Sequence, residues 1–162
     1  MAKLFRRILV PHDFSRSATR ALDLAVALAE DHGGQVTALH VLTPLYSGPG
    51  YPTPDEIAWT TTSEMRAKRK GDLEALVRRA LGPRAARVTC RVAVGEAAPA
   101  ILAAAKRADS IVISTLGRTG LAHFLLGSVA EKIVRLAPVP VLAVRARPKP
   151  ERAKETAGGR RR

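Results

Sequence analysis

The chain has 162 residues, of which 46% are hydrophobic and 4% aromatic, and 27 basic residues against 14 acidic ones give a net charge of +13. This length predicts a single domain with enough chain to bury a core. No apolar run approaches the roughly 20 residues of a membrane span, and no signal-type apolar segment follows the basic N-terminus, so we expect a cytoplasmic protein without membrane association. Cys90 is the single cysteine, which excludes an internal disulfide and predicts a small buried hydrophobe.

Nearly half of the net positive charge lies at the C-terminus. Residues 145–162 hold eight Lys and Arg and two Glu. This stretch has prolines and glycines but no large apolar residue, so it cannot bury enough surface to become ordered. We therefore expect a folded domain over 1–146 and a disordered basic tail over 147–162. The tail would permit weak, sequence-independent binding to polyanions, because it has no aromatic residues for base stacking.

Strands and helices alternate along the predicted domain. A buried strand is expected over 7–13, ended by Pro11, and Ser15 is the candidate N-cap of a helix that stops at Gly33. The elements expected after it are a strand over 36–42, a helix from about 55 to 81, a strand over 88–94, a helix over 97–107, a strand over 111–115, a helix from 128 and a strand over 141–144.

This β-α-β-α-β-α-β-α-β order predicts an α/β protein with an open parallel five-stranded sheet and helices on both faces. In such sheets, ligands bind beyond the carboxyl ends of the strands, at the point where the strand order reverses. The segments 11–13 and 42–44 and the loop after the fourth strand are therefore expected to meet at one cleft.

The loop after the fourth strand is glycine-rich and leads into a helix. It contains Gly117, Gly120 and Gly127, and Ser128 stands three residues before Glu131 in the spacing of a capping box. We therefore expect Ser128 to be the N-cap of this helix. Glycines, free backbone N–H groups and the helix dipole favour a phosphate site, although a plain connecting turn fits the same residues.

Two common nucleotide motifs are missing. The chain contains no G-x-x-x-x-G-K-[ST], and no G-x-G-x-x-G follows its first strand. These absences exclude a P-loop and the dinucleotide fingerprint. Four scattered histidines without a cysteine partner argue against a zinc site, and no G-x-S-x-G elbow is present to support a hydrolase.

Several segments together resemble the universal stress protein family. They read ILVPHDFS, ALHV, ADSIVIST, LGRTGLAHFLLGSVAEKIVR and VPVLAVR, and the likeness covers about residues 3–145. The family pattern G-x2-G-x9-G-[ST] fits Gly117, Gly127 and Ser128, whereas Ser114 stands in the first glycine position. The resemblance implies a Rossmann-like fold of the adenine nucleotide alpha hydrolase-like type. It also implies an ATP-binding stress-response regulatory protein that forms a homodimer through residues 139–144.

The resemblance also implies which residues bind the nucleotide. Asp13 would lie by the ribose or the metal-bound phosphates, Val41 would contact the adenine, and the residues around Gly127 would donate hydrogen bonds to the phosphates. The complete implied set is Pro11, His12, Asp13, Val41, Ser114, Gly117, Arg118, Gly127, Ser128 and Val129. The cofactor would be ATP, AMP or ADP with Mg²⁺ or Mn²⁺, and Asp13 is the candidate metal ligand.

Alternatives remain open at three of these positions. Asp13 fits a cap of the first helix or its preceding turn as well as a ligand contact, and Arg118 fits either a phosphate contact or a solvated side chain. Ser114 would strain the backbone if the position needs a positive φ, but the uninterrupted strand over 111–115 favours an extended conformation.

The predicted activity is regulatory rather than catalytic. No dedicated general base or arginine finger is visible, so we expect slow ATP hydrolysis at most and assign no catalytic residue. The substitution at Ser114 motivates an alternative in which the same fold has lost nucleotide binding and acts as a dimeric interaction module. A third interpretation, nucleic-acid association, would rest on the basic tail.

Overall fold

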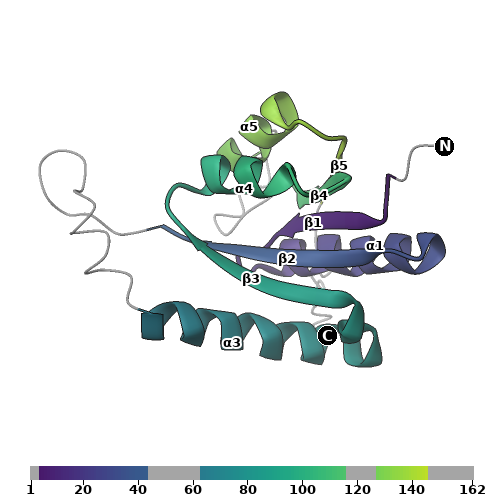
Figure 1. The fold of residues 1–162 in the computed structure, drawn as a ribbon, viewed down its shortest axis with the longest axis vertical. Helices are drawn as coiled ribbons and strands as arrows, with labels where there is room; N and C mark the ends of the chain where they lie inside the picture. Colours follow the sequence, from purple (N-terminus) through teal and green to yellow (C-terminus); the bar gives the residue numbers. More distant parts are fainter. Residues whose placement is uncertain (1–3, 44–62, 116–126, 146–162) are drawn as a thin grey trace, which may run out of the picture.

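The computed structural model describes residues 4–43, 63–115 and 127–145. Their five strands form one parallel sheet in the order β3-β2-β1-β4-β5, as Figure 1 shows. The elements are β1 (Arg7–Pro11), α1 (Arg16–His32), β2 (Gln35–Leu42), α3 (Ser63–Leu81), the 3-10 helix η1 (Gly82–Arg87), β3 (Val88–Val94), α4 (Ala97–Ala105), β4 (Ser110–Ser114), α5 (Ser128–Leu136) and β5 (Val141–Val144).

The predicted α/β fold is confirmed, with small shifts at the ends of elements. The first strand ends at Pro11 rather than at residue 13, since the chain turns where the His12 N–H donates to the carbonyl of Leu39 at 2.8 Å. Helix α4 ends at Ala105 rather than at residue 107 because a tighter turn follows, in which Ala108 N donates to Ala105 O at 3.0 Å. Residues 44–62, within which the second helix was expected to begin at about residue 55, and the basic tail lie outside the described residues.

Helix α1 has the termini that its sequence predicts. The Ser15 hydroxyl accepts a hydrogen bond from the N–H of Ala18 at 3.1 Å, which caps the first turn. Gly33 adopts φ 63°, a left-handed conformation that glycine reaches without strain, and Gly34 N donates back to Ala29 O at 2.7 Å. Both signals act locally, so α1 begins and ends where expected.

Helices cover both faces of the sheet, as Figure 1 shows. On one face, α1 and α3 pack over a core that includes Ile8, Val10 and Leu22. On the other face, α4 and α5 pack over a core that includes Leu9 and Ile111. Burial on both faces explains the continuous apolar runs of β1 and β4.

Strand β1 lies at the point where the strand order reverses. It pairs with β2 on one side and with β4 on the other, with Ile8 opposite Val36 and Ser110, respectively. The crossovers after β1 and β4 therefore diverge from this position and leave room at the carboxyl ends of both strands. No helix in the described part of the chain is long and apolar enough to cross a membrane.

Candidate functional site

A cavity of about 350 Å³ lies at the carboxyl ends of β1, β2 and β4, beside the start of α5. This is within the usual size range of a small-molecule site. Gly117 and Arg118 of the predicted site lie outside the described residues. The other eight predicted residues all line this cavity: Pro11, His12, Asp13, Val41, Ser114, Gly127, Ser128 and Val129.

The turn between β1 and α1 forms one wall of the cavity. Asp13 accepts a hydrogen bond from the N–H of Ser15 through Oδ1 at 3.0 Å, and its side chain also lines the cavity. Phe14 between them has φ 66°, a strained conformation for a residue with a large side chain. Asp13 thus caps the turn before α1 and also lines the cavity, while its contact with a ligand stays a prediction.

His12 is held inside the same turn. Its side chain is 3% exposed, Nδ1 accepts from the N–H of Phe14 at 3.1 Å, and Nε2 lies 3.3 Å from the hydroxyl of Thr19. Burial lowers the pKa of His12 to about 4, against the opposing effect of Asp13 and with a further lowering by His40. The imidazole is therefore neutral near pH 7, with its proton on Nε2 because Nδ1 is an acceptor.

His40 joins β2 to this turn. Its Nδ1 lies 2.8 Å from the carbonyl oxygen of His12, which can only accept, so Nδ1 carries the proton. The ring of His40 also contacts Phe14 edge-on, with centroids 4.7 Å apart. These contacts connect the end of β1 to β2, and His40 lines the cavity between them.

The start of α5 faces the cavity without a side-chain cap. The N-cap is Gly127 rather than Ser128, so the capping-box prediction is wrong. The reason is the path of the chain from β4: Gly127 N donates to Thr115 O at 2.9 Å, while Gly127 O accepts the first helical hydrogen bond from Glu131 N at 2.9 Å. Glycine offers no side-chain acceptor to the first turn, and the residues 128–130 line the cavity at the positive end of the helix dipole.

Ser114 is the last residue of β4 and is 9% exposed. It pairs with Val144 of β5, and Phe14 is the one non-glycine residue with positive φ in the described part of the chain. The extended backbone expected at Ser114 is therefore confirmed. A side chain at this position therefore does not strain the strand.

Further residues line the cavity that are not in the predicted set of site residues, although Thr43 lies in the segment 42–44 expected at this cleft. Thr43 and Thr115 follow directly after β2 and β4, and Ala97 and Ile101 of α4 provide an apolar wall next to Val41. The two threonines could have been predicted from the sequence, because the positions just beyond strand ends are those where ligands bind in parallel sheets. His40 and the α4 residues had no such signal.

The donor set at this cavity suits a nucleotide better than a free metal ion. The described residues contain no group of three or more His, Cys, Asp or Glu side chains placed to hold a metal. Asp13 alone supplies a carboxylate, which fits Mg²⁺ or Mn²⁺ bound through one carboxylate together with phosphate oxygens.

The sheet order and the cavity at its reversal point define an open, Rossmann-like α/β protein. The model of the universal stress protein family matches residues 4–145. A universal stress protein of Methanocaldococcus jannaschii is 31% identical over 91% of this chain and 86% of its own length. The chain therefore belongs to the universal stress protein family.

Solved structures show the same fold. The universal stress protein UspA from Lactobacillus plantarum has 26% sequence identity and a TM-score of 0.70, covering 87% of this chain and 98% of that chain. The universal stress protein from Archaeoglobus fulgidus in complex with dAMP has 26% identity and a TM-score of 0.60, covering 86% of this chain and 98% of that one.

Proposed function

We propose that this protein binds an adenine nucleotide, ATP in the first instance, in the cavity between β1, β2, β4 and α5. The observation that carries the proposal is the start of α5, where a glycine N-cap leaves the first-turn N–H groups without a side-chain acceptor beside a cavity. The complex of the Archaeoglobus fulgidus relative with dAMP supports the same ligand class.

The lining residues divide the cavity into three parts. The backbone around Gly127 and Ser128 would donate to the phosphates, and Asp13 would face the ribose or a metal ion bound to the phosphates. The apolar wall with Val41 and Ile101 would hold the adenine. A divalent ion would neutralise phosphate charge at Asp13.

The side chains that line the cavity favour a regulatory role over rapid catalysis. Both ring nitrogens of His12 lie within hydrogen-bond distance of neighbours and the ring is buried, so His12 does not act as a general base toward a ligand. Asp13 Oδ1 is occupied by the N–H of Ser15. Hydrolysis would therefore be slow, and the nucleotide would act chiefly as a signal carried by a protein of the cytoplasm.

Ser114 favours a second candidate function. Ser114 lines the cavity at the position where the family pattern has glycine, the residue that allows a ligand the closest approach to the backbone. A protein that had lost nucleotide binding in this way would act as a dimeric interaction module. In either case, self-association would use β5, an edge strand on which Leu142 is 40% exposed.

Calorimetric titration of the full chain with ATP and with AMP tests the proposal. We expect the wild type to bind and Gly127→Val to lose binding, because a branched side chain at the N-cap would cover the phosphate donors. Gly71→Ala is the control, since an added Cβ at Gly71 meets nothing within 4 Å. Absence of wild-type binding would overturn nucleotide binding in favour of the interaction module.

A further inference from the structure

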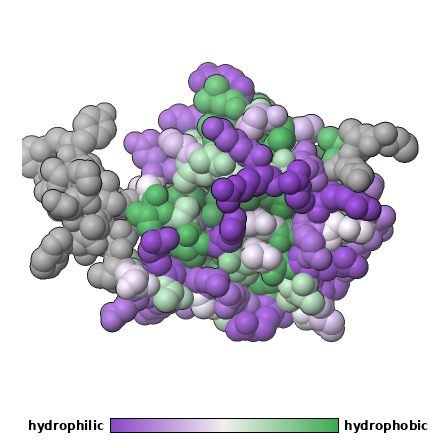
Figure 2. Space-filling view, in the orientation of Figure 1, coloured by the Kyte–Doolittle hydropathy of each residue, from purple (hydrophilic) through white to green (hydrophobic). Residues whose placement is uncertain are grey.

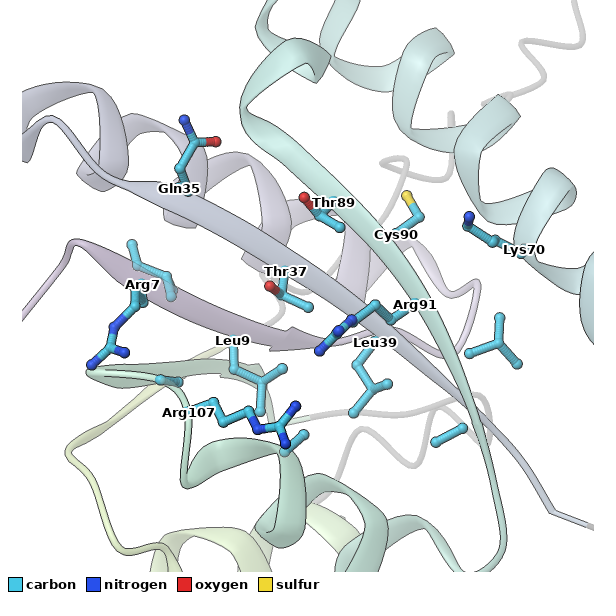
Figure 3. A pocket seen from close by; sticks show the side chains of 15 residues that line it. Arg7, Leu9, Gln35, Thr37, Leu39, Lys70, Thr89, Cys90, Arg91 and Arg107 are labelled. Atoms are coloured by element: carbon cyan, nitrogen blue, oxygen red, sulfur yellow. The ribbon is translucent and has the colours of Figure 1, made fainter.

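A second cavity, of about 580 Å³, lies on the α4 side of the sheet over β1, β2 and β3, where α4 leaves the strands uncovered. Figure 3 shows Leu9 and Leu39 within it, Thr37 and Thr89 above them, and two arginine side chains reaching across. Figure 2 shows hydrophilic side chains lying over hydrophobic ones on this face of the molecule. The cavity therefore combines apolar surface with positive charge.

The charge comes from Arg91 of β3 and Arg107 after α4. Their side chains point toward one another in Figure 3, and neither has a carboxylate within salt-bridge distance among the described residues. Arg7 lines the same cavity but is paired with Asp109 at 2.6 Å. Two guanidinium groups that converge without a counter-charge favour an anionic occupant.

Strand β3 forms the outer border of this cavity and is an edge of the sheet. Its seven residues all pair with β2, from Val88 opposite Val36 to Val94 opposite Leu42. Among the described residues, no strand pairs with the other side of β3. Its outward backbone N–H and C=O groups are therefore available to an added strand.

A third cavity, of about 650 Å³, lies on the opposite side of the same edge, between β3 and α3. Its lining combines small apolar residues with charged ones: Val77, Ala85, Val88 and Cys90 on the one hand and Lys70, Glu74 and Arg78 on the other. Burial raises the pKa of the Cys90 thiol to about 11, so this side chain is uncharged near neutral pH. A strand added to β3 would direct alternate side chains into the basic cavity and the others toward this cavity beside α3.

We propose that the β3 edge binds an extended segment of a partner protein with acidic residues at alternate positions and small apolar residues between them. Backbone pairing along β3 would supply affinity, while Arg91 and Arg107 would select carboxylates on one face of the added strand.

Other occupants fit this edge less well. Arg91 is the middle residue of Val88–Val94, so symmetric pairing of two copies over the whole length of β3 would place Arg91 opposite itself, and like charges directly opposite destabilise a sheet. The C-terminal tail of the chain is itself basic. Nucleic acid would find no aromatic side chain for base stacking among the residues that line the basic cavity.

A labelled heptapeptide that alternates Glu and Val, matched in length to β3, tests the proposal by fluorescence anisotropy with the full chain. We expect Arg91→Gln combined with Arg107→Gln to weaken binding about tenfold. The double variant Arg79→Gln with Arg135→Gln removes the same charge from exposed positions outside both cavities and should change affinity less than about twofold.

Four further probes separate the alternatives. The same peptide with Gln in place of Glu should bind weakly. Two further peptides carry N-methyl groups, one at its Glu positions and the other at its Val positions. If the peptide adds as a strand, only one of these two should lose binding, because alternate backbone N–H groups face β3. Stronger binding of a single-stranded oligothymidylate than of the acidic peptide would overturn the proposal, as would equal losses in the two double variants. Titration of the Arg91 and Arg107 variant with ATP should match the wild type, since neither arginine lines the nucleotide cavity.

Discussion

Arg7 and Asp109, 102 positions apart in the chain, join the start of β1 to the start of β4 through three hydrogen bonds to the Asp109 carboxylate and a fourth from Asp109 N to Arg7 O at 2.8 Å. Asp109 Oδ2 accepts from the backbone N–H of Arg7 at 2.9 Å, and Oδ1 accepts from Nε at 3.0 Å and from Nη2 at 2.6 Å. The side-chain hydrogen bonds to Asp109 and the negative charge of its carboxylate raise the pKa of the Arg7 guanidinium. Because the next residues, Ile8 and Ser110, are paired in the sheet, this contact secures the register of β1 against β4.

We expect Asp109→Ala to lower the thermal unfolding midpoint more than Arg7→Gln does. The alanine variant leaves the backbone N–H of Arg7 without its acceptor, whereas the glutamine variant removes an exposed guanidinium only. Asp109→Asn, which retains a carbonyl oxygen, should fall between them. Calorimetry at low and high salt measures the order, and equal effects of Asp109→Ala and Arg7→Gln would contradict it.

His12 should make stability depend on pH. Its pKa of about 4 in the folded protein lies below the ordinary histidine value of 6.5, so the unfolded chain binds more protons between these values. The contribution of neutral His12 to the free energy of unfolding is complete above the pKa that this residue has in the unfolded chain. It is lost as the pH falls toward the pKa in the folded protein. We expect about 3 kcal/mol of unfolding free energy to be lost in this range through His12.

Urea unfolding at several pH values, compared with His12→Asn, isolates this contribution. Asparagine supplies an oxygen that can accept from the N–H of Phe14 in place of Nδ1, but does not titrate. The variant should therefore lose less stability on acidification than the wild type. Parallel curves for the two proteins would show that His12 is not the titrating group.

Substitution of alanine for either of two neighbouring glycines, Gly33 and Gly34, should destabilise the protein, but for different reasons. A Cβ on Gly34 would collide with the carbonyl oxygen of Phe5 and lie 2.9 Å from Cα of Arg6, so Gly34→Ala should cost roughly 2–3 kcal/mol of unfolding free energy. Gly33 has open space but φ +63°, so Gly33→Ala should cost about 1 kcal/mol.

Gly71→Ala provides the matched control for these two variants. Gly71 lies inside α3 with nothing within 4 Å of an added Cβ, and alanine there should stabilise the protein by roughly 0.5–1 kcal/mol. Chemical denaturation measures all three variants. A Gly34→Ala variant as stable as wild type would contradict the close approach of α1's end to the segment before β1.

Ser114 should have little effect on nucleotide affinity. Its backbone is that of a strand, so a side chain there causes no strain, and its hydroxyl contributes on the order of 1 kcal/mol at most. We expect Ser114→Gly to change ATP affinity less than about tenfold in titration. A wild type that fails to bind while Ser114→Gly binds would establish the interaction module instead.

The β5 edge should mediate self-association. Leu142 is 40% exposed on this strand, and a charge there would be desolvated in a paired edge, so Leu142→Asp should convert dimers to monomers. Leu24→Asp is the control, because Leu24 is 38% exposed on α1. Sedimentation of the wild type as a monomer at all micromolar concentrations would exclude the dimer.

The features predicted from the sequence are those that depend on nearby residues. Ser15 and Gly33 lie next to the helix whose ends they determine, and the apolar runs of the strands report burial directly. The segments 11–13 and 42–44 could be assigned to one cleft because parallel strands bring their carboxyl ends together, whereas Val41 was implied by the family resemblance.

The remaining features depend on contacts between distant segments. Ser128 had the local pattern of an N-cap, but the hydrogen bond between Gly127 and Thr115 determines where α5 begins. Arg91 and Arg107 meet only because α4 leaves part of the sheet uncovered. No spacing in the sequence reports how far a helix extends across a neighbouring strand.

The order β3-β2-β1-β4-β5 places the two free edges of the sheet at opposite ends of the molecule. If two copies pair through β5, their β3 edges point outward at the far ends of one continuous sheet. Such an assembly would be bivalent, and a partner carrying two acidic segments would gain avidity only if its linker spans the whole double sheet. The spacing between the segments of a partner would then decide whether it is held by one dimer or bridges two.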